Sequence, residues 1–309
     1  NIGGGAVDIN SGAAFTLADG IVVSSGSGGI TIDTTGANVL TVNGTVQTAG
    51  AGTITLTGTD DITMDADSLV QAAAAVVLSG AETVTIDAVT STGSTVGITS
   101  TNDSILEADS SNLVTGTTVT LNAGVGGGDS VGTDANRINT TAGTLAGQAG
   151  TGGFYVDETD AVVLGNITSA AALGLTAGGA ISDSGDLDIE ATTTIDATGF
   201  DVVLDRATHD FTGAVSVTGA NITVVDANAL ILGANTATGT FAATATAGDI
   251  TDSGTLTVAA ASTFVTGANG SDIILDDASN AFTGAVTLRA DQGGAGAGTF
   301  NDITFVDSA

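Results

Sequence analysis

An internal repeat is the feature that most constrains how this chain can fold. The segment Leu204 to Val215 (LDRATHDFTGAV) recurs as Leu275 to Val286 (LDDASNAFTGAV), with eight of twelve positions identical. Gly179 to Ile189 (GAISDSGDLDI) recurs at a similar offset as Gly248 to Val258 (GDITDSGTLTV). A repeat of about 70 residues therefore occupies the C-terminal half of the chain.

A shorter period lies inside the chain. An apolar residue, an acid and an alanine recur at Met64-Asp65-Ala66, Ile86-Asp87-Ala88 and Leu106-Glu107-Ala108. The spacing of these acids gives a unit of about 20 residues, and three such units make approximately one long repeat. If each unit is one turn of a solenoid, the three acids stack in one column.

The elements between the repeats' turns are predicted to be short strands. The chain has 46 Gly and no Pro, so Gly, Asn and Asp must form its turns. Between them lie runs rich in Val, Ile and Thr that are too short for helices. These runs are Gly52 to Thr57, Glu82 to Ile86, Thr117 to Leu121, Ala214 to Val217, Asn221 to Val225, Thr255 to Val258, Asp272 to Leu275 and Ala285 to Leu288. The run Gln71 to Leu78 (QAAAAVVL) is predicted to be one buried strand despite its four alanines.

Short strands that repeat without helices predict an all-β fold: a right-handed parallel β-helix, or β-solenoid, with turns of about 20–23 residues. We expect a single solenoid domain over residues 1–309, with the clearest long repeats at 155–224 and 225–294. A β-propeller is the main competitor, but its blades need roughly 40 residues and usually carry aromatic signatures. Aromatic residues make up only 3% of this chain.

Charge excludes several classes of partner. The chain has 34 Asp plus Glu against 3 Lys plus Arg, a formal net charge of −31. Three scattered arginines cannot neutralise the phosphates of a nucleic acid or the surface of an anionic membrane. The longest apolar run, Ala72 to Leu78, is far shorter than the roughly 20 residues that span a bilayer. With no Cys, the chain also has no disulfides and no thiolate chemistry.

Clustered carboxylates are the candidate metal ligands, because Ca²⁺ prefers oxygen ligands from carboxylates and backbone carbonyls. The predicted calcium ligands are Asp60, Asp61, Asp65 and Asp67 in one group, and Asp157, Glu158 and Asp160 in another. The alternative interpretation of these acids, and of the column at Asp65, Asp87 and Glu107, is a solvated acidic surface. No other cofactor is predicted.

Candidates for catalysis are few. Acidic pairs such as Asp183 and Asp186 could serve as acid and base, since parallel β-helices also host polysaccharide lyases and hydrolases. Arg206 and His209 lie close together in sequence, but Asp277 and Asn280 replace them in the second copy. A surface loop explains this drift better than a ligand site does. We therefore predict no catalytic residues.

The phrase LDDASNAFTGAVTL, the segment GDITDSGTLTV and a composition without Cys or Lys resemble the repeat region of filamentous-haemagglutinin-type exoproteins. These are very large bacterial adhesins exported by two-partner secretion. The resemblance covers residues 155–309 by clear repeats, and residues 1–154 by composition and looser periodicity. It implies a right-handed parallel β-helix that forms a stalk, and it implies no catalytic residues. The Asn-Pro motifs of the family's secretion domain are missing from this Pro-free chain, so we expect a segment of a longer protein or a processed filament subunit.

These features together predict an extracellular structural protein at a bacterial cell surface or in a matrix. It would be the stalk of an adhesin or the subunit of a filament, and the alternative is a protein that binds or cleaves polysaccharides. Asp302 to Val306 still has a strand pattern and neither end offers a cap, so we expect head-to-tail stacking of copies or continuation along a longer chain. Host or matrix glycans and proteins are the possible ligands.

Overall fold

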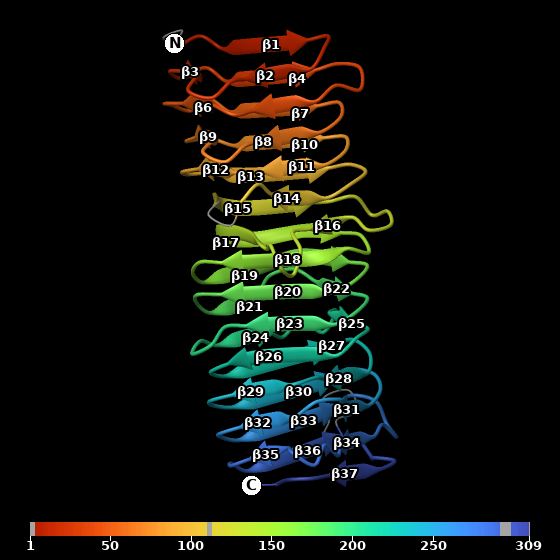
Figure 1. Cartoon of the computed structure of the whole chain (residues 1–309). Helices are drawn as coiled ribbons and strands as arrows, with labels where there is room; N and C mark the ends of the chain where they lie inside the picture. Colours follow the sequence, from red (N-terminus) through yellow and green to blue (C-terminus); the bar gives the residue numbers. More distant parts are fainter. Residues whose placement is uncertain (1–3, 110–112, 291–297, 309) are drawn as a thin grey trace. The chain divides into compact units, whose positions relative to one another are not determined.

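Strands pair with strands one turn further along the chain, and these pairings are parallel (Figure 1). The computed structural model describes residues 4–109, 113–290 and 298–308, and within these ranges it contains strands and turns but no helix. Accordingly, this part of the chain has no helix that is long and apolar enough to cross a membrane. The chain divides into two compact units, Asn1–Thr159 and Asp160–Ala309. Each unit is a parallel β-solenoid, which confirms the predicted fold class.

The strands of the first unit are β1 Val7–Ser11, β2 Phe15–Leu17, β3 Val22–Ser25, β4 Ile30–Thr34, β5 Leu40–Val42, β6 Thr45–Thr48, β7 Ile54–Gly58, β8 Ile62–Met64, β9 Leu69–Ala72, β10 Val76–Gly80, β11 Val84–Ile86, β12 Ala88–Ser91, β13 Thr95–Ser100, β14 Ile105–Glu107, β15 Val114–Asn122, β16 Ser130–Val131, β17 Ile138–Ala149 and β18 Gly153–Glu158.

The strands of the second unit are β19 Val162–Ser169, β20 Leu173–Ala177, β21 Ile181–Asp183, β22 Leu187–Ile189, β23 Thr193–Asp196, β24 Val202–Leu204, β25 Asp210–Phe211, β26 Val215–Gly219, β27 Ile222–Asp226, β28 Leu230–Leu232, β29 Asn235–Ala237, β30 Phe241–Ala245, β31 Ile250–Asp252, β32 Leu256–Val258, β33 Ser262–Thr266, β34 Ile273–Leu275, β35 Ala281–Phe282, β36 Val286–Ala290 and β37 Ile303–Phe305.

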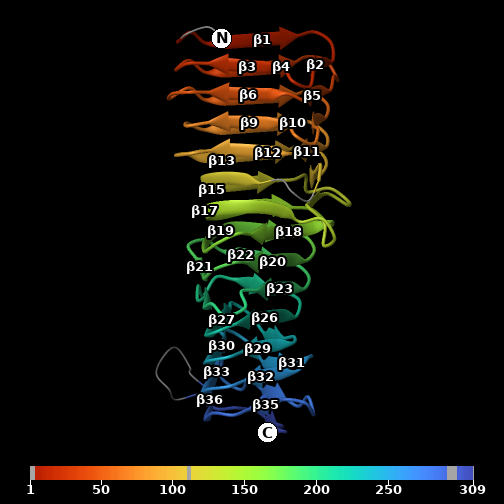
Figure 2. The same cartoon turned by 60° about the vertical axis from the view of Figure 1, so that its left-hand side comes forward.

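Three strands make one turn. On one face β1 pairs with β4 and β4 with β7, while β3, β6, β9 and β12 stack on another face (Figure 2). Ile30 aligns with Ile54, Ile54 with Val76, and Val76 with Val96. Each of these turns therefore holds about 20–24 residues, close to the predicted spacing.

Side chains alternate between inward and outward positions along each strand, and the inward ones form the core. Ile32, Leu56, Leu78 and Ile98 align in four successive turns, and all four are fully buried. Each such side chain contributes roughly 1.5–3 kcal/mol by leaving water. The second unit adds a run of phenylalanines: ring centroids lie 5.8 Å apart for Phe241 and Phe264, and 5.9 Å apart for Phe264 and Phe282.

Buried hydroxyls at the ends of strands stabilise the corners. Thr34 Oγ1 donates to the Asn38 carbonyl at 2.8 Å, and Thr48 Oγ1 donates to the Gly52 carbonyl at 2.9 Å. A carbonyl in a turn has no ladder partner, so a hydroxyl from the preceding strand satisfies it. Polar residues therefore lie inside the solenoid where the chain changes direction.

The long repeat comprises ten strands, which is three turns and one additional strand. The first copy of the LD–FTGAV segment starts at the end of β24, and the second starts at the end of β34. Strands of one face recur every third strand, since β24 pairs with β27, β27 with β30 and β30 with β33. Equivalent residues of the two copies therefore lie on successive faces. The three-unit estimate from the sequence was one strand too short.

The repeated glycine of the FTGAV segment has a steric cause in both copies. A Cβ at Gly213 would lie 2.4 Å from the Ala191 carbonyl carbon, and one at Gly284 would lie 2.3 Å from the Ala260 carbonyl carbon. Only glycine lets the backbones of adjacent turns approach this closely.

One predicted strand was wrong. Gln71 to Leu78 is not one strand but the end of β9 and the start of β10, with a corner at residues 73–75. β9 pairs with β12, and β10 with β7 and β13, so the two halves lie on different faces. The small alanine side chains allow the chain to turn there.

Candidate functional site

The first predicted group of metal ligands, Asp60, Asp61, Asp65 and Asp67, is divided between the two ends of β8. Burial raises the pKa of Asp61, and neighbouring acids, among them Glu82 and Asp103 of later turns, raise it further. Asp67 lies instead within electrostatic reach of Asp87. The structure therefore places these four carboxylates in two separate acidic clusters.

The second predicted group is also divided. On β18, Glu158 faces inward and is 3% exposed, whereas Asp157 is half-buried, with Oδ1 3.6 Å from Nη1 of Arg137. Thr140 Oγ1 donates to Glu158 Oε2 at 2.7 Å, and the Ala142 N–H donates to the same oxygen at 3.0 Å. Adjacent residues of a strand point to opposite faces, so these two acids cannot share an ion.

Asp160 is the third member of that predicted group and is exposed in the second unit. Across the described parts of the chain, no three His, Cys, Asp or Glu side chains converge in a way that could hold a metal ion.

Glu107 does not lie where the predicted column requires. The column aligned Glu107 with Asp87, but the register of β11 and β14 aligns it with Ile86. The interval from Asp87 to Glu107 is one residue shorter than the turn from Val84 to Ile105, and a one-residue shift moves a side chain to the other face of the strand. Glu107 therefore takes a position that is apolar and buried one turn before.

Burial raises the pKa of Glu107 to about 7, because the carboxylate loses its hydration. Asn139 opposes this shift, since its N–H donates to Glu107 Oε1 at 2.5 Å and its Nδ2 donates to the same carboxylate at 3.2 Å. The charges of Asp109 and Asp157 raise the pKa further.

His209 is fully buried beside Asp183. Its Nε2 lies 2.8 Å from Asp183 Oδ2, and its Nδ1 accepts the N–H of Leu187 at 3.0 Å. Because Nδ1 accepts a hydrogen bond, the proton of the neutral ring is on Nε2, which donates to the carboxylate. Burial lowers the pKa of His209, although the charge of Asp183 opposes the shift. The predicted surface loop is correct for the exposed Arg206 and wrong for His209.

The second copy builds the same network without a histidine. Asn280, the equivalent of His209, donates from Nδ2 to Asp252 Oδ2 at 2.6 Å, and the Leu256 N–H donates to Asn280 Oδ1 at 2.8 Å. The amide oxygen replaces Nδ1 and the amide nitrogen replaces Nε2–H. An asparagine cannot transfer a proton at neutral pH, so what the two copies share is a structural bond between turns rather than acid–base chemistry.

A second contact between turns, the one between Arg206 and Asp186, also has different residues in the second copy. Arg206 Nε and Thr208 Oγ1 both donate to Asp186 Oδ1 at 2.6 Å. In the second copy Asp277 takes the place of Arg206 and Thr255 that of Asp186, and Thr255 Oγ1 donates to Asp277 Oδ1 at 3.4 Å. Donor and acceptor have exchanged sides, which preserves the contact between turns.

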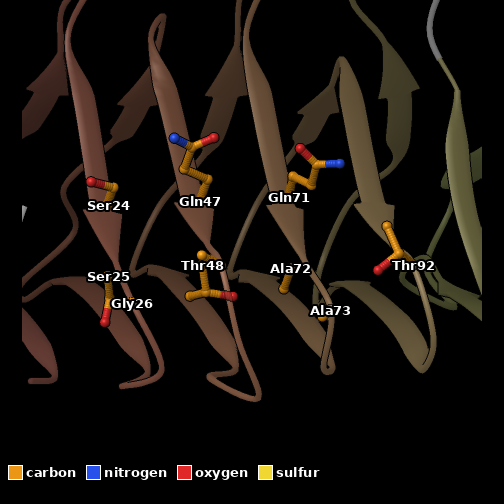
Figure 3. Close-up of a pocket in the computed structure, with 10 residues that line it drawn as sticks. Ser24, Ser25, Gly26, Gln47, Thr48, Gln71, Ala72, Ala73 and Thr92 are labelled. Carbon is orange, nitrogen blue, oxygen red and sulfur yellow. The ribbon is translucent and has the colours of Figure 1, made fainter. Parts of the chain in front are cut away.

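A polar groove of about 400 Å³ crosses four turns of the first unit (Figure 3). It is lined by Ser24, Ser25, Gly26, Gln47, Thr48, Ala49, Gln71, Ala72, Ala73 and Thr92. The hollow forms because the corner residues after β3, β6 and β9 are small, whereas the glutamines on the strands beside them are long. No lining residue is charged.

Sequence reasoning missed this groove. The signal available was Gln47 and Gln71, which follow apolar residues at the same point of successive turns. Neutral amides neither titrate nor form the carboxylate clusters that indicate a metal site, so no catalytic or metal-binding pattern marks them.

Comparison with known proteins adds one finding. A family model described as repeats of unknown function (DUF5649) matches residues 151–218 and 219–289. These two consecutive matches agree in length with the long repeat seen in the sequence, and residues 1–150 lie outside them. No curated protein and no solved structure matches the chain.

The two copies predict how substitutions of His209 behave. His209→Asn should retain most of the free energy of unfolding at pH 7.5, because asparagine makes both bonds in the second copy. His209→Ala should lose about 3 kcal/mol, since it leaves Asp183 and the Leu187 N–H buried without partners. Urea unfolding measures both variants, with Asn280→Ala as the matched variant of the second copy. Equal losses for His209→Asn and His209→Ala would refute the equivalence.

The pKa of Glu107 predicts a pH dependence of stability. A carboxyl whose folded pKa is about 7 against an ordinary 4.5 stabilises the fold fully below about pH 4.5, and this contribution is lost as the pH rises through 7. Glu107→Gln keeps an oxygen for the Asn139 N–H and cannot ionise. We expect it to raise the melting temperature at pH 8 and to change it little at pH 4.5. Asp19→Asn, at an exposed acid that makes no hydrogen bond or ion pair in the described structure, is the control, and an equal effect of Glu107→Gln at both pH values would contradict the prediction.

Proposed function

We propose that this chain is the structural repeat region of an extracellular protein, either the stalk of a bacterial surface adhesin or the subunit of a filament at the cell surface or in a matrix. In this proposal the solenoid provides reach and carries no catalytic centre. It continues by stacking on further turns, from a longer chain or from other copies. The resemblance to filamentous-haemagglutinin-type exoproteins supports the location and the stalk role.

One observation supports this proposal most: side chains that could perform chemistry instead hold adjacent turns together. The Asp272 N–H donates to Asp249 Oδ1 at 2.8 Å, and the Asp302 N–H donates to Asp272 Oδ1 at 2.8 Å. In the same unit the Asp276 N–H donates to Asp252 Oδ1 at 3.1 Å. Carboxylates used as acceptors between turns are what a self-supporting stack requires.

Charge supports an exposed location. A net charge of −31 keeps a repeat protein soluble and opposes unspecific association. The same charge opposes end-to-end stacking of copies, which divalent cations such as Ca²⁺ would relieve by screening. Calcium enters the proposal in this role, as a counterion for acidic surfaces.

If the chain is a stalk, that is, a modular spacer, it should still fold after the loss of one long repeat. Deleting residues 205–275 joins Leu204 to Asp276, the equivalent of Asp205, so each remaining residue meets the neighbours that its repeat equivalent had. We expect this variant to keep its β-sheet circular dichroism and to unfold cooperatively. The control deletes residues 205–263, which joins Leu204 to Phe264, its own ladder equivalent, so the alternation along the joined strand shifts by one residue; this variant should lose most of its structure. Equal loss of structure in both variants would contradict a modular spacer.

The absence of catalysis is tested directly. The purified chain, incubated with neutral and acidic polysaccharides, is expected to release no reducing or unsaturated ends, because Asp183 and Asp186 are hydrogen-bonded within the fold. Reducing-sugar assays and absorbance of unsaturated products measure this. Product formation at enzymatic rates, abolished by Asp186→Asn, would favour the carbohydrate-cleaving alternative.

A further inference from the structure

An uncharged column of hydrogen-bonding side chains runs along the first unit beside the groove. Strand register aligns one outward-facing residue in each of six successive turns. These residues, the amide–hydroxyl column, are Ser24, Gln47, Gln71, Thr90, Thr115 and Thr141. At about 4.8 Å per turn the column is about 24 Å long.

The two glutamine amides of the column have free hydrogen-bonding capacity. Gln47 and Gln71 are partners in the ladder of β6 and β9, and Figure 3 shows both side chains standing out from adjacent strands. Neither side chain makes a hydrogen bond within the described structure. Each amide offers two N–H donors and one carbonyl acceptor. Together they place a mixed set of donors and acceptors at the rim of the groove.

The hydroxyl groups at the floor of the groove, by contrast, already make hydrogen bonds within the fold. Ser25 Oγ donates to the Gly5 carbonyl at 2.8 Å, and Thr48 Oγ1 donates to the Gly52 carbonyl at 2.9 Å. The floor residues Ser25 and Thr48 are buried and aligned in the ladder of β3 and β6. A preformed floor with free polar groups at its rim resembles a binding site that needs little reorganisation.

Charge selects the class of ligand. The chain carries 34 acidic residues, yet none lines the groove or belongs to the amide–hydroxyl column. The negative field of the molecule repels anions, and a cation would gain more at the acidic clusters than at neutral amides. A neutral molecule rich in hydroxyl groups matches both the absence of charge and the mixture of donors and acceptors.

Because the column runs along the stacked turns, a polymeric ligand fits it better than a single sugar does. One polar residue per turn recurs at a distance comparable to one sugar residue of an extended glycan. A groove without an aromatic ring provides no stacking surface, so each sugar contributes little and several must bind together. We propose that the groove and the amide–hydroxyl column of the first unit bind an uncharged polysaccharide that lies along the stacked turns. This site is independent of the stalk role and needs no catalytic group.

The test uses the full chain and neutral hexasaccharides of glucose, mannose, galactose and N-acetylglucosamine, with a galacturonate hexamer as the anionic probe. Isothermal titration calorimetry should detect saturable binding of at least one neutral hexamer with a dissociation constant in the millimolar range. The trimer should bind more weakly, and the anionic hexamer should not bind.

Variants locate the site. Gln47→Ala combined with Gln71→Ala should weaken binding about tenfold, because two free amides are removed. The matched control combines Thr31→Ala with Thr55→Ala, two outward residues aligned on the face formed by β4 and β7, and should bind as the wild type does. Thermal melts test whether both variants fold. If the glutamine pair disrupts folding, Gln47→Glu with Gln71→Glu, which introduces charge at the same size, replaces it and should weaken binding at least as much.

Three results would overturn the proposal: no saturable binding of any neutral hexamer, equal weakening in both double variants, or binding of the galacturonate hexamer as tight as that of the neutral ones. Each is independent of the deletion experiment, so the stalk role and the glycan site can fail separately.

Discussion

Parallel hydrogen bonding between turns is the constraint on which the rest of this structure depends. It gives each residue of a strand a neighbour at the same position, about 4.8 Å away, in the turn before and the turn after. Whatever is inward in one turn is inward in the next. Apolar columns such as Ile32, Leu56, Leu78 and Ile98 follow, and they lengthen the core with each added turn.

The same alignment is unfavourable for charge, and a chain with 34 acids must manage it. Two stacked carboxylates about 4.8 Å apart repel in water by roughly 0.9 kcal/mol before screening. In the second unit the column at Asp249, Asp272 and Asp302 offsets this repulsion, because each of its first two carboxylates accepts the backbone N–H of the next acid in the column. Acidic residues therefore act as connectors between turns, and a bound metal is not needed to explain them.

Sequence patterns were sufficient for the fold because the hydrophobic period and the turn residues recur in every turn. The strands around Ile54 and Val84 were found by alternation alone, and the repeats predicted their parallel stacking. These patterns could not predict details that change when a turn is longer or shorter by one residue. An interval one residue shorter than the turn moved Glu107 inward, and a bend at three alanines divided the run Gln71 to Leu78. Burial of His209 was not visible either, because its partner Asp183 lies in another turn, far away in sequence.

The length of the long repeat has a consequence for where function can lie. Because ten strands are three full turns plus one strand, each residue of the repeat lies on the next face of the solenoid in the second copy. The His209 network at β22 and β25 therefore recurs as the Asn280 network at β32 and β35. Duplication of this unit cannot build an axial column of equivalent residues on one face. The six residues of the amide–hydroxyl column all precede residue 151 and so lie outside the two matched repeats. The column is therefore not a product of the matched repeats. Absence of charge alone does not distinguish it, because the column that begins at Thr31 and Thr55 is uncharged as well; the unbonded amides of Gln47 and Gln71 beside the groove do.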